Sequence, residues 1–99
     1  MSERQEIARD GAKAQKNSGR GKFQKGDATL GEFLIDYKES GKGVRVDEKM
    51  WAKICTDAVK AGNLEPVLKL IIGEGKHKIR LAVISWEEFE ELNGQNDSA

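Results

Sequence analysis

The sequence has little of what stabilises small secreted domains or anchors a chain in a membrane. Its 99 residues include one cysteine, one proline and one histidine, which excludes a disulfide framework and a zinc site built from cysteines. No apolar run approaches the roughly 18 residues that a membrane-spanning helix needs, and the N-terminus is charged rather than signal-like. We therefore expect a single domain with no membrane partner, located in the cytoplasm.

Charge is abundant but unevenly distributed. The 17 basic and 17 acidic residues cancel, yet residues 1–26 carry a net charge of +4 and the last fourteen residues carry −5. A basic N-terminal region is suited to bind phosphate groups, although overall neutrality predicts weaker non-specific affinity for nucleic acid than a strongly basic chain has. The alternative is that these charges belong to ordinary solvated helix faces.

Hydrophobic periodicity and turn residues predict an α/β domain. We expect helices over residues 2–15, 48–61 and 86–92, and strands over residues 26–30, 33–39, 67–72 and 79–84. The central helix is the best defined, because Asp47 is suited to cap its start and Gly62 to end it. The apolar run of the third strand indicates burial on both faces. The domain is expected to span residues 1–93, with residues 94–99 as a disordered tail.

Two carboxylates and one amine gather on the two adjoining strands near the N-terminus. Side chains alternate between the faces of a strand, so Asp36 and Lys38 share one face while Ile35 and Tyr37 share the other. Asp27 on the preceding strand then lies within reach of Asp36. Two carboxylates beside an ammonium group suit a hard divalent cation such as Mg²⁺ and the hydrolysis of phosphodiesters. Taken alone, the same pattern is also that of any half-solvated strand.

The element order, Lys25-Gly26-Asp27 and Asp36-Tyr37-Lys38 together resemble the PD-(D/E)xK nuclease superfamily. More narrowly, the chain resembles the phage-encoded relatives of the archaeal-type Holliday junction resolvases. The resemblance implies a restriction-endonuclease-like αβββαβ core, with a central mixed sheet flanked by helices. It also implies a homodimer that cuts four-way DNA junctions during recombination and repair, in a phage-infected or prophage-bearing bacterial cell.

The resemblance assigns roles to individual residues. Asp27 and Asp36 would bind Mg²⁺, for which Mn²⁺ can substitute, and the carbonyl of Tyr37 would be a further ligand. Lys38 would orient or activate the attacking water. A glutamate of the first helix would complete the site, and no organic cofactor is expected.

The helix acid and the phosphate contacts come from the N-terminal region. Either Glu3 or Glu6 is the helix acid, and we favour Glu6 because Glu3 lies in the first turn, where a carboxylate also serves the helix dipole. DNA contacts are expected from basic and hydroxyl side chains of this region, namely Arg4, Ser18, Arg20, Lys22 and Lys25.

Other functions and other readings of single residues stay open. The chain could be a DNA-binding module that does not cut, or a nicking or repair nuclease with another DNA substrate. Trp51 and Trp86 begin amphipathic helices, so we expect core packing rather than base stacking, with a subunit contact as the next possibility. His77 is expected in an exposed turn, and Cys55 in a packing role.

Overall fold

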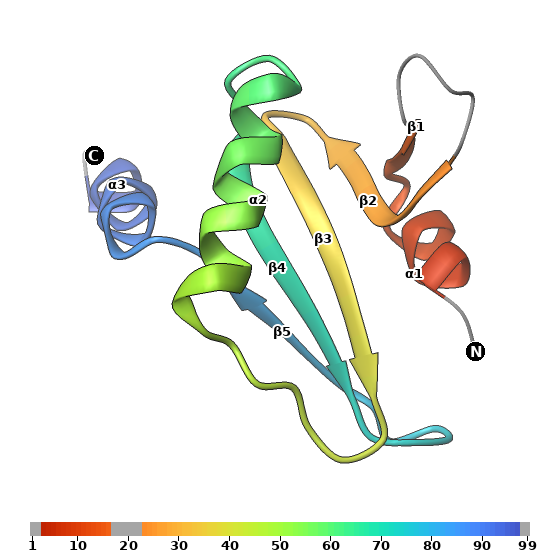
Figure 1. Cartoon of the computed structure of the whole chain (residues 1–99). Helices are drawn as coiled ribbons and strands as arrows, with labels where there is room; N and C mark the ends of the chain where they lie inside the picture. The colour runs from red at the N-terminus through yellow and green to blue at the C-terminus, as the bar shows by residue number, and fades with distance from the viewer. Residues whose placement is uncertain (1–2, 17–22, 98–99) are drawn as a thin grey trace.

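The computed structural model describes residues 3–16 and 23–97, which form one mixed α/β fold, as expected from the sequence (Figure 1). In chain order the elements are α1 (Glu3–Asp10), β1 (Lys13–Lys16), β2 (Phe23–Leu30), β3 (Phe33–Ser40), α2 (Glu48–Lys60), β4 (Glu65–Ile72), β5 (Ile79–Val83) and α3 (Trp86–Asp97). The sheet has the order β1-β2-β3-β4-β5, in which β3 and β4 are parallel and all other neighbours antiparallel.

The sheet separates two hydrophobic clusters, one under each of two helices. Successive side chains of β3 point to opposite faces, so Ile35 and Tyr37 pack against Ile7 of α1, whereas Leu34 packs against Ile54 of α2. Central strand β4 contributes to both clusters, and the predicted burial of this strand on both faces is confirmed. Each side chain of β3 therefore faces either α1 or α2, according to its position along the strand.

The central helix and the hairpin before it follow the sequence closely. Asp47 caps α2, since its side chain accepts a hydrogen bond from the Met50 amide at 2.9 Å, and Gly62 ends the helix in the left-handed region at φ 119°. Gly31 and Glu32 connect β2 to β3, and Gly31 adopts φ 60° in this tight turn.

The first helix is shorter than the sequence suggests. It ends at Asp10 rather than at residue 15, because Gly11 takes a left-handed conformation at φ 70° and its amide bonds back to the carbonyl of Ala8. The chain then forms β1, which pairs with β2. After Gly11, backbone hydrogen bonds to β2 therefore outweigh the local preference for a helix.

The C-terminal helix is longer than the sequence suggests. It continues to Asp97, so residues 94–97, which we expected in a disordered tail, are helical. Its first residue, Trp86, is 67% exposed, so the prediction that Trp86 packs into the core is wrong, whereas half-buried Trp51 does pack against the α2-side cluster. His77 is exposed, as predicted. No helix in the described part of the chain is long and apolar enough to cross a membrane.

Candidate functional site

Two aspartates lie side by side across the β2–β3 hairpin. Asp27 is the register partner of Asp36, and both are buried, with exposed fractions of 3% and 6%. Asp36 lies opposite Leu68 of β4, whose side chain belongs to the α2-side cluster, so the pair is on the face that α2 covers. Their carboxyl groups share a hydrogen bond. The predicted approach of Asp27 to Asp36 is confirmed.

Burial of two acids at one place changes their protonation. Burial, and next the charge of Asp36, raise the pKa of Asp27 to about 7. Burial also raises the pKa of Asp36, although the Lys38 ammonium opposes that shift. The shared hydrogen bond favours the protonated form of Asp27 and the ionised form of Asp36. The raised pKa values of both acids mean that this buried pair resists carrying two negative charges.

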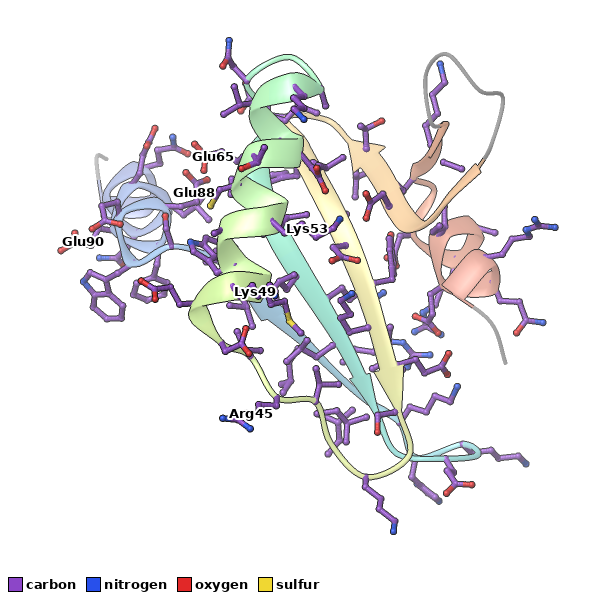
Figure 2. All side chains as sticks on the ribbon, in the orientation of Figure 1. Arg45, Lys49, Lys53, Glu65, Glu88 and Glu90 are labelled. Carbon is purple, nitrogen blue, oxygen red and sulfur yellow. The ribbon has the colours of Figure 1, made fainter. Side chains whose placement is uncertain are left out.

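Two lysines bring positive charge to the aspartate pair. Lys38 Nζ lies 3.4 Å from Asp36 Oδ2, and its side chain is 38% exposed. Lys53 reaches the same region from α2, on the side of the helix that faces β3 in Figure 2, and its charge lowers the pKa of both aspartates. The hydrogen bond from Lys53 Nζ to Asp57 Oδ2, at 3.0 Å, raises the pKa of Lys53 and keeps this lysine charged.

Lys53 and Asp57 were missed as site residues in the sequence. Their spacing of four residues is that of an ordinary ion pair on a helix surface. Nothing in the sequence tells which stripe of α2 turns toward the hairpin, so the spacing alone could not have placed them beside Asp27 and Asp36. The negative charge of Asp57 also contributes to the raised pKa of Asp27.

The expected helix acid is not brought to this pair. Glu6 is buried on the opposite face, where it accepts hydrogen bonds from Nε and Nη2 of Arg80, both at 3.0 Å, and lies 3.2 Å from Lys69 Nζ. These bonds, first of all those from Arg80, lower the pKa of Glu6 to about 2. The reason is the packing of α1, because its Ile7 belongs to the cluster beneath β3 that faces away from α2.

The other predicted residues are only partly placed. Tyr37 follows Asp36 on β3, and its side chain lies on the α1 face, where the hydroxyl donates to Asp10 Oδ2 at 2.9 Å. A ligand role for its carbonyl stays a prediction. Arg4 is exposed on α1. The remaining candidates for DNA contact, together with the side chain of Glu3, lie outside what the structure describes: Ser18, Arg20, Lys22 and the side chain of Lys25.

The chemistry of the donor set fits a divalent cation. Burial and the closeness of the two acids raise the pKa values of Asp27 and Asp36, and a cation between them would offset their negative charges. Within residues 3–16 and 23–97, no cluster of three or more acidic, histidine or cysteine side chains is arranged to hold a metal. Mg²⁺ keeps several of its waters and is commonly bound by only one or two carboxylates.

Comparisons with known proteins give no match: no family model, no curated protein and no solved structure resembles the chain. Function must therefore be inferred from the residues of the site.

Proposed function

We propose that the protein is a Mg²⁺-dependent endonuclease that cuts phosphodiester bonds in branched DNA, with four-way junctions as its substrate. The observation that carries this proposal is the buried pair of Asp27 and Asp36 with the ammonium of Lys38 at 3.4 Å. The order from α1 to β4 is also the αβββαβ order of a restriction-endonuclease-like core. The proposal includes a homodimer, since symmetric cutting of a junction needs two sites, and a cytoplasmic location.

A structural role does not account for the aspartate pair. Burying two like charges costs free energy, and apolar residues of similar volume would pack the same space without that cost. Groups with strongly shifted pKa values and a specific charged partner are typical of functional sites. The pair is therefore better understood as a cation site than as part of the core.

The residues of the site divide the work. Asp27 and Asp36 would hold Mg²⁺, which when bound supplies a water of lowered pKa and offsets negative charge on the phosphate. Lys38 is placed to donate a hydrogen bond to the attacking water or to a phosphate oxygen. Because its hydrogen bond to Asp57 keeps Lys53 protonated, Lys53 would stabilise negative charge on the phosphate rather than remove a proton.

The test is cleavage of labelled four-way junction, flap and linear duplex DNA, with Mg²⁺ or with a chelator. We expect cutting of the junction in Mg²⁺ alone. Asp27→Asn and Asp36→Asn should bind the junction without cutting it, because each removes a ligand charge with little change of volume. Asp47→Asn is a matched control, since asparagine caps a helix as well as aspartate does. Cutting by Asp36→Asn at the wild-type rate would overturn the proposal.

One observation favours a second candidate, a DNA-binding module that does not cut. Glu6 is engaged by Arg80 on the far face, so the first-helix acid that the nuclease site would need does not reach Asp27 and Asp36. The same experiment separates the two functions. Tight junction binding without cleavage of any substrate in Mg²⁺ or Mn²⁺ would identify the module. Cleavage of flap or linear DNA in preference to junctions would instead indicate a nicking or repair nuclease.

A further inference from the structure

The C-terminal helix α3 carries an apolar stripe that nothing in the described chain covers. Trp86, Phe89 and Leu92 are 67%, 49% and 39% exposed, and their spacing of three residues places them on one side of the helix. The rings of Trp86 and Phe89 lie 5.1 Å apart, so they form one continuous surface. Figure 1 shows α3 standing away from the sheet, and no other described helix or strand packs against it.

A second uncovered apolar surface lies at the β5 edge of the sheet. Ile79 and Leu81, which are 56% and 46% exposed, pair in register with Ile72 and Leu70 of the α2-side cluster. Their side chains therefore extend that cluster beyond the edge of α2. We call Ile79 and Leu81 the edge patch.

An isolated α3 would be only marginally stable as a helix. Helices shorter than about 12–15 residues are marginal in water, and α3 also contains Gly94. Glu88 and Glu90 flank the apolar stripe, one on each side, as the helical spacing requires. Partial burial, and next the charge of Glu65, raise the pKa of Glu88. The helix thus lacks both an apolar partner and positive charge.

Positive charge without an ion-pair partner in the described chain is available on the segment that leads into α2 from the end of β3, where Ser40 pairs with Ile72 and Ile72 with Ile79. Arg45 precedes Val46, and Lys49 lies in the first turn of α2; neither makes an ion pair within the part of the chain that the structure describes. Figure 2 shows these two cations at the start of α2, and Glu88 and Glu90 on α3. An apolar patch with basic neighbours therefore matches an apolar stripe with acidic neighbours.

We propose that the partner is a second copy of this chain, and that α3 of each copy packs on the edge patch of the other. The contact is reciprocal, so it closes as a two-fold dimer. Trp86 and Phe89 keep 67% and 49% of their surface exposed, out of the roughly 150–250 Å² that each such side chain can bury. With an equal area on the receiving patch, two such contacts reach roughly 700–1,200 Å², about the 1,000 Å² that a specific interface needs.

The first test measures molecular mass by light scattering over a concentration series. The wild type should form dimers, and the double variant Trp86→Ala/Phe89→Ala should be monomeric but still folded, with an unchanged far-ultraviolet circular-dichroism spectrum, because no other described helix or strand packs against α3. Val59→Ala is the matched control, since Val59 is 62% exposed on α2 outside the edge patch. A wild type that stays monomeric, or a double variant that still dimerises, overturns the proposal.

The second test exchanges the charges. The variants Glu88→Lys/Glu90→Lys and Arg45→Glu/Lys49→Glu should each dimerise more weakly than the wild type at low salt, since like charges then meet in both contacts. An equimolar mixture should recover the dimer, because both contacts then join opposite charges. No recovery overturns the reciprocal arrangement. This interface rests on the homodimer of the proposed function. A monomeric wild type would overturn both the interface and that homodimer, a dimer that survives these changes would overturn the interface alone, and failure of cleavage leaves the interface untouched.

Discussion

The two faces of the sheet bury acids in opposite ways. On the α1 face, Glu6 is held by Arg80 and Lys69, and its pKa falls to about 2. On the α2 face, Asp27 lies against Asp36, and its pKa rises to about 7. Burial raises the pKa of both acids, but on the α1 face the hydrogen bonds from Arg80 outweigh burial, whereas on the α2 face burial acts first and the charge of Asp36 adds to it.

This difference separates an acid that stabilises the fold from one that serves a site. Glu6 has both carboxylate oxygens engaged by protein cations, so it joins α1 to β5 and β4 and has no capacity left for a metal. Asp27 and Asp36 lie against each other as register partners, so a cation between them would offset two like charges. A buried carboxyl group thus serves either the fold or the candidate site, depending on which residues surround it.

The largest effect should come from exchanging a lysine on either face for alanine. Lys38→Ala should reduce the cleavage rate by roughly 10²–10⁴-fold, as expected for loss of a group that assists proton transfer, with little change in stability. Lys69→Ala should lower the free energy of unfolding and leave the cleavage rate of the folded protein little changed. The reason is that Lys69 Nζ lies 2.7 Å from Asp10 Oδ2 and 3.2 Å from Glu6 Oε1. Single-turnover kinetics and urea denaturation measure the two effects. Equal loss of cleavage in both variants would contradict the division between the faces.

The next prediction concerns Glu6. Glu6→Gln should lower the free energy of unfolding by roughly 2–3 kcal/mol, the range for hydrogen bonds to charged groups, while the folded protein cuts at an unchanged rate. Glu87→Gln, at an exposed position of α3, is the matched control and should change stability little. Urea denaturation and the cleavage assay check both quantities. A folded Glu6→Gln protein that cannot cut would return Glu6 to the site as its helix acid.

The two faces should also respond to pH in opposite directions in the metal-free protein. The pKa of Asp27 rises from 3.8 to about 7 on folding, so its stabilising effect is complete below 3.8 and is lost as pH rises through about 7. The pKa of Glu6 falls from 4.5 to about 2 on folding. The stabilising effect of Glu6 is therefore complete above pH 4.5 and is lost as pH falls through about 2. Melting temperatures against pH measure both.

Asp27→Asn provides the control for this pH dependence. Compared with the wild type, it should melt at a higher temperature at pH 8 in chelator, because residue 27 then no longer has to ionise beside Asp36. Mg²⁺ should raise the melting temperature of the wild type and not that of the variant. A variant less stable than the wild type at pH 8 would show that the aspartate pair contributes to stability.

The smallest effect is expected for Tyr37→Phe. This change removes the hydroxyl that donates to Asp10 at 2.9 Å and leaves the ring in the α1-side cluster. We expect a loss of about 1 kcal/mol in the free energy of unfolding. Cleavage should not change, because the ring lies on the face away from the aspartate pair. Urea denaturation with the cleavage assay tests both statements.

Local patterns predicted a large part of the fold correctly. The alternation along residues 33–39, the turn at Gly31 and the capping of α2 by Asp47 all depend on neighbours within a few residues. The errors arose where distant partners compete with local preference. Residues 13–16 pair with β2 instead of continuing the first helix, and Trp86 lies on a helix that leaves the domain rather than covering it.

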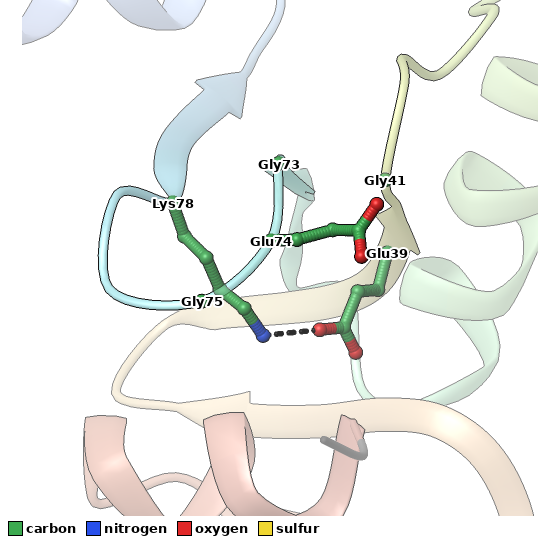
Figure 3. A pocket seen from close by; sticks show the side chains of 6 residues that line it. All are labelled: Glu39, Gly41, Gly73, Glu74, Gly75 and Lys78. Carbon is green, nitrogen blue, oxygen red and sulfur yellow. Dashed lines mark hydrogen bonds and ion pairs between the residues drawn. The ribbon is translucent and has the colours of Figure 1, made fainter.

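A pocket in the described part of the chain forms where two segments that are far apart in sequence meet. It has a volume of about 520 Å³ and lies between the end of β3 and the β4–β5 turn, where Glu39 binds Lys78 at 2.6 Å (Figure 3). The ion pair already engages Glu39 and Lys78, which leaves Glu74 as the other charged side chain of the lining. The pocket is therefore a feature of how the turn closes against β3, and sequence alone gave no sign of it.

By itself, the sequence determined the aspartate pair, because Asp27 and Asp36 belong to one hairpin whose register follows from a short turn and an alternating strand. Only the tertiary structure decided what surrounds each acid. Glu6 and Arg80 are separated by 74 residues, and Lys53 reaches the pair only because α2 crosses this face of the sheet. Local geometry fixes neighbours within a hairpin, whereas the face that a helix covers depends on how the whole chain buries its apolar surface.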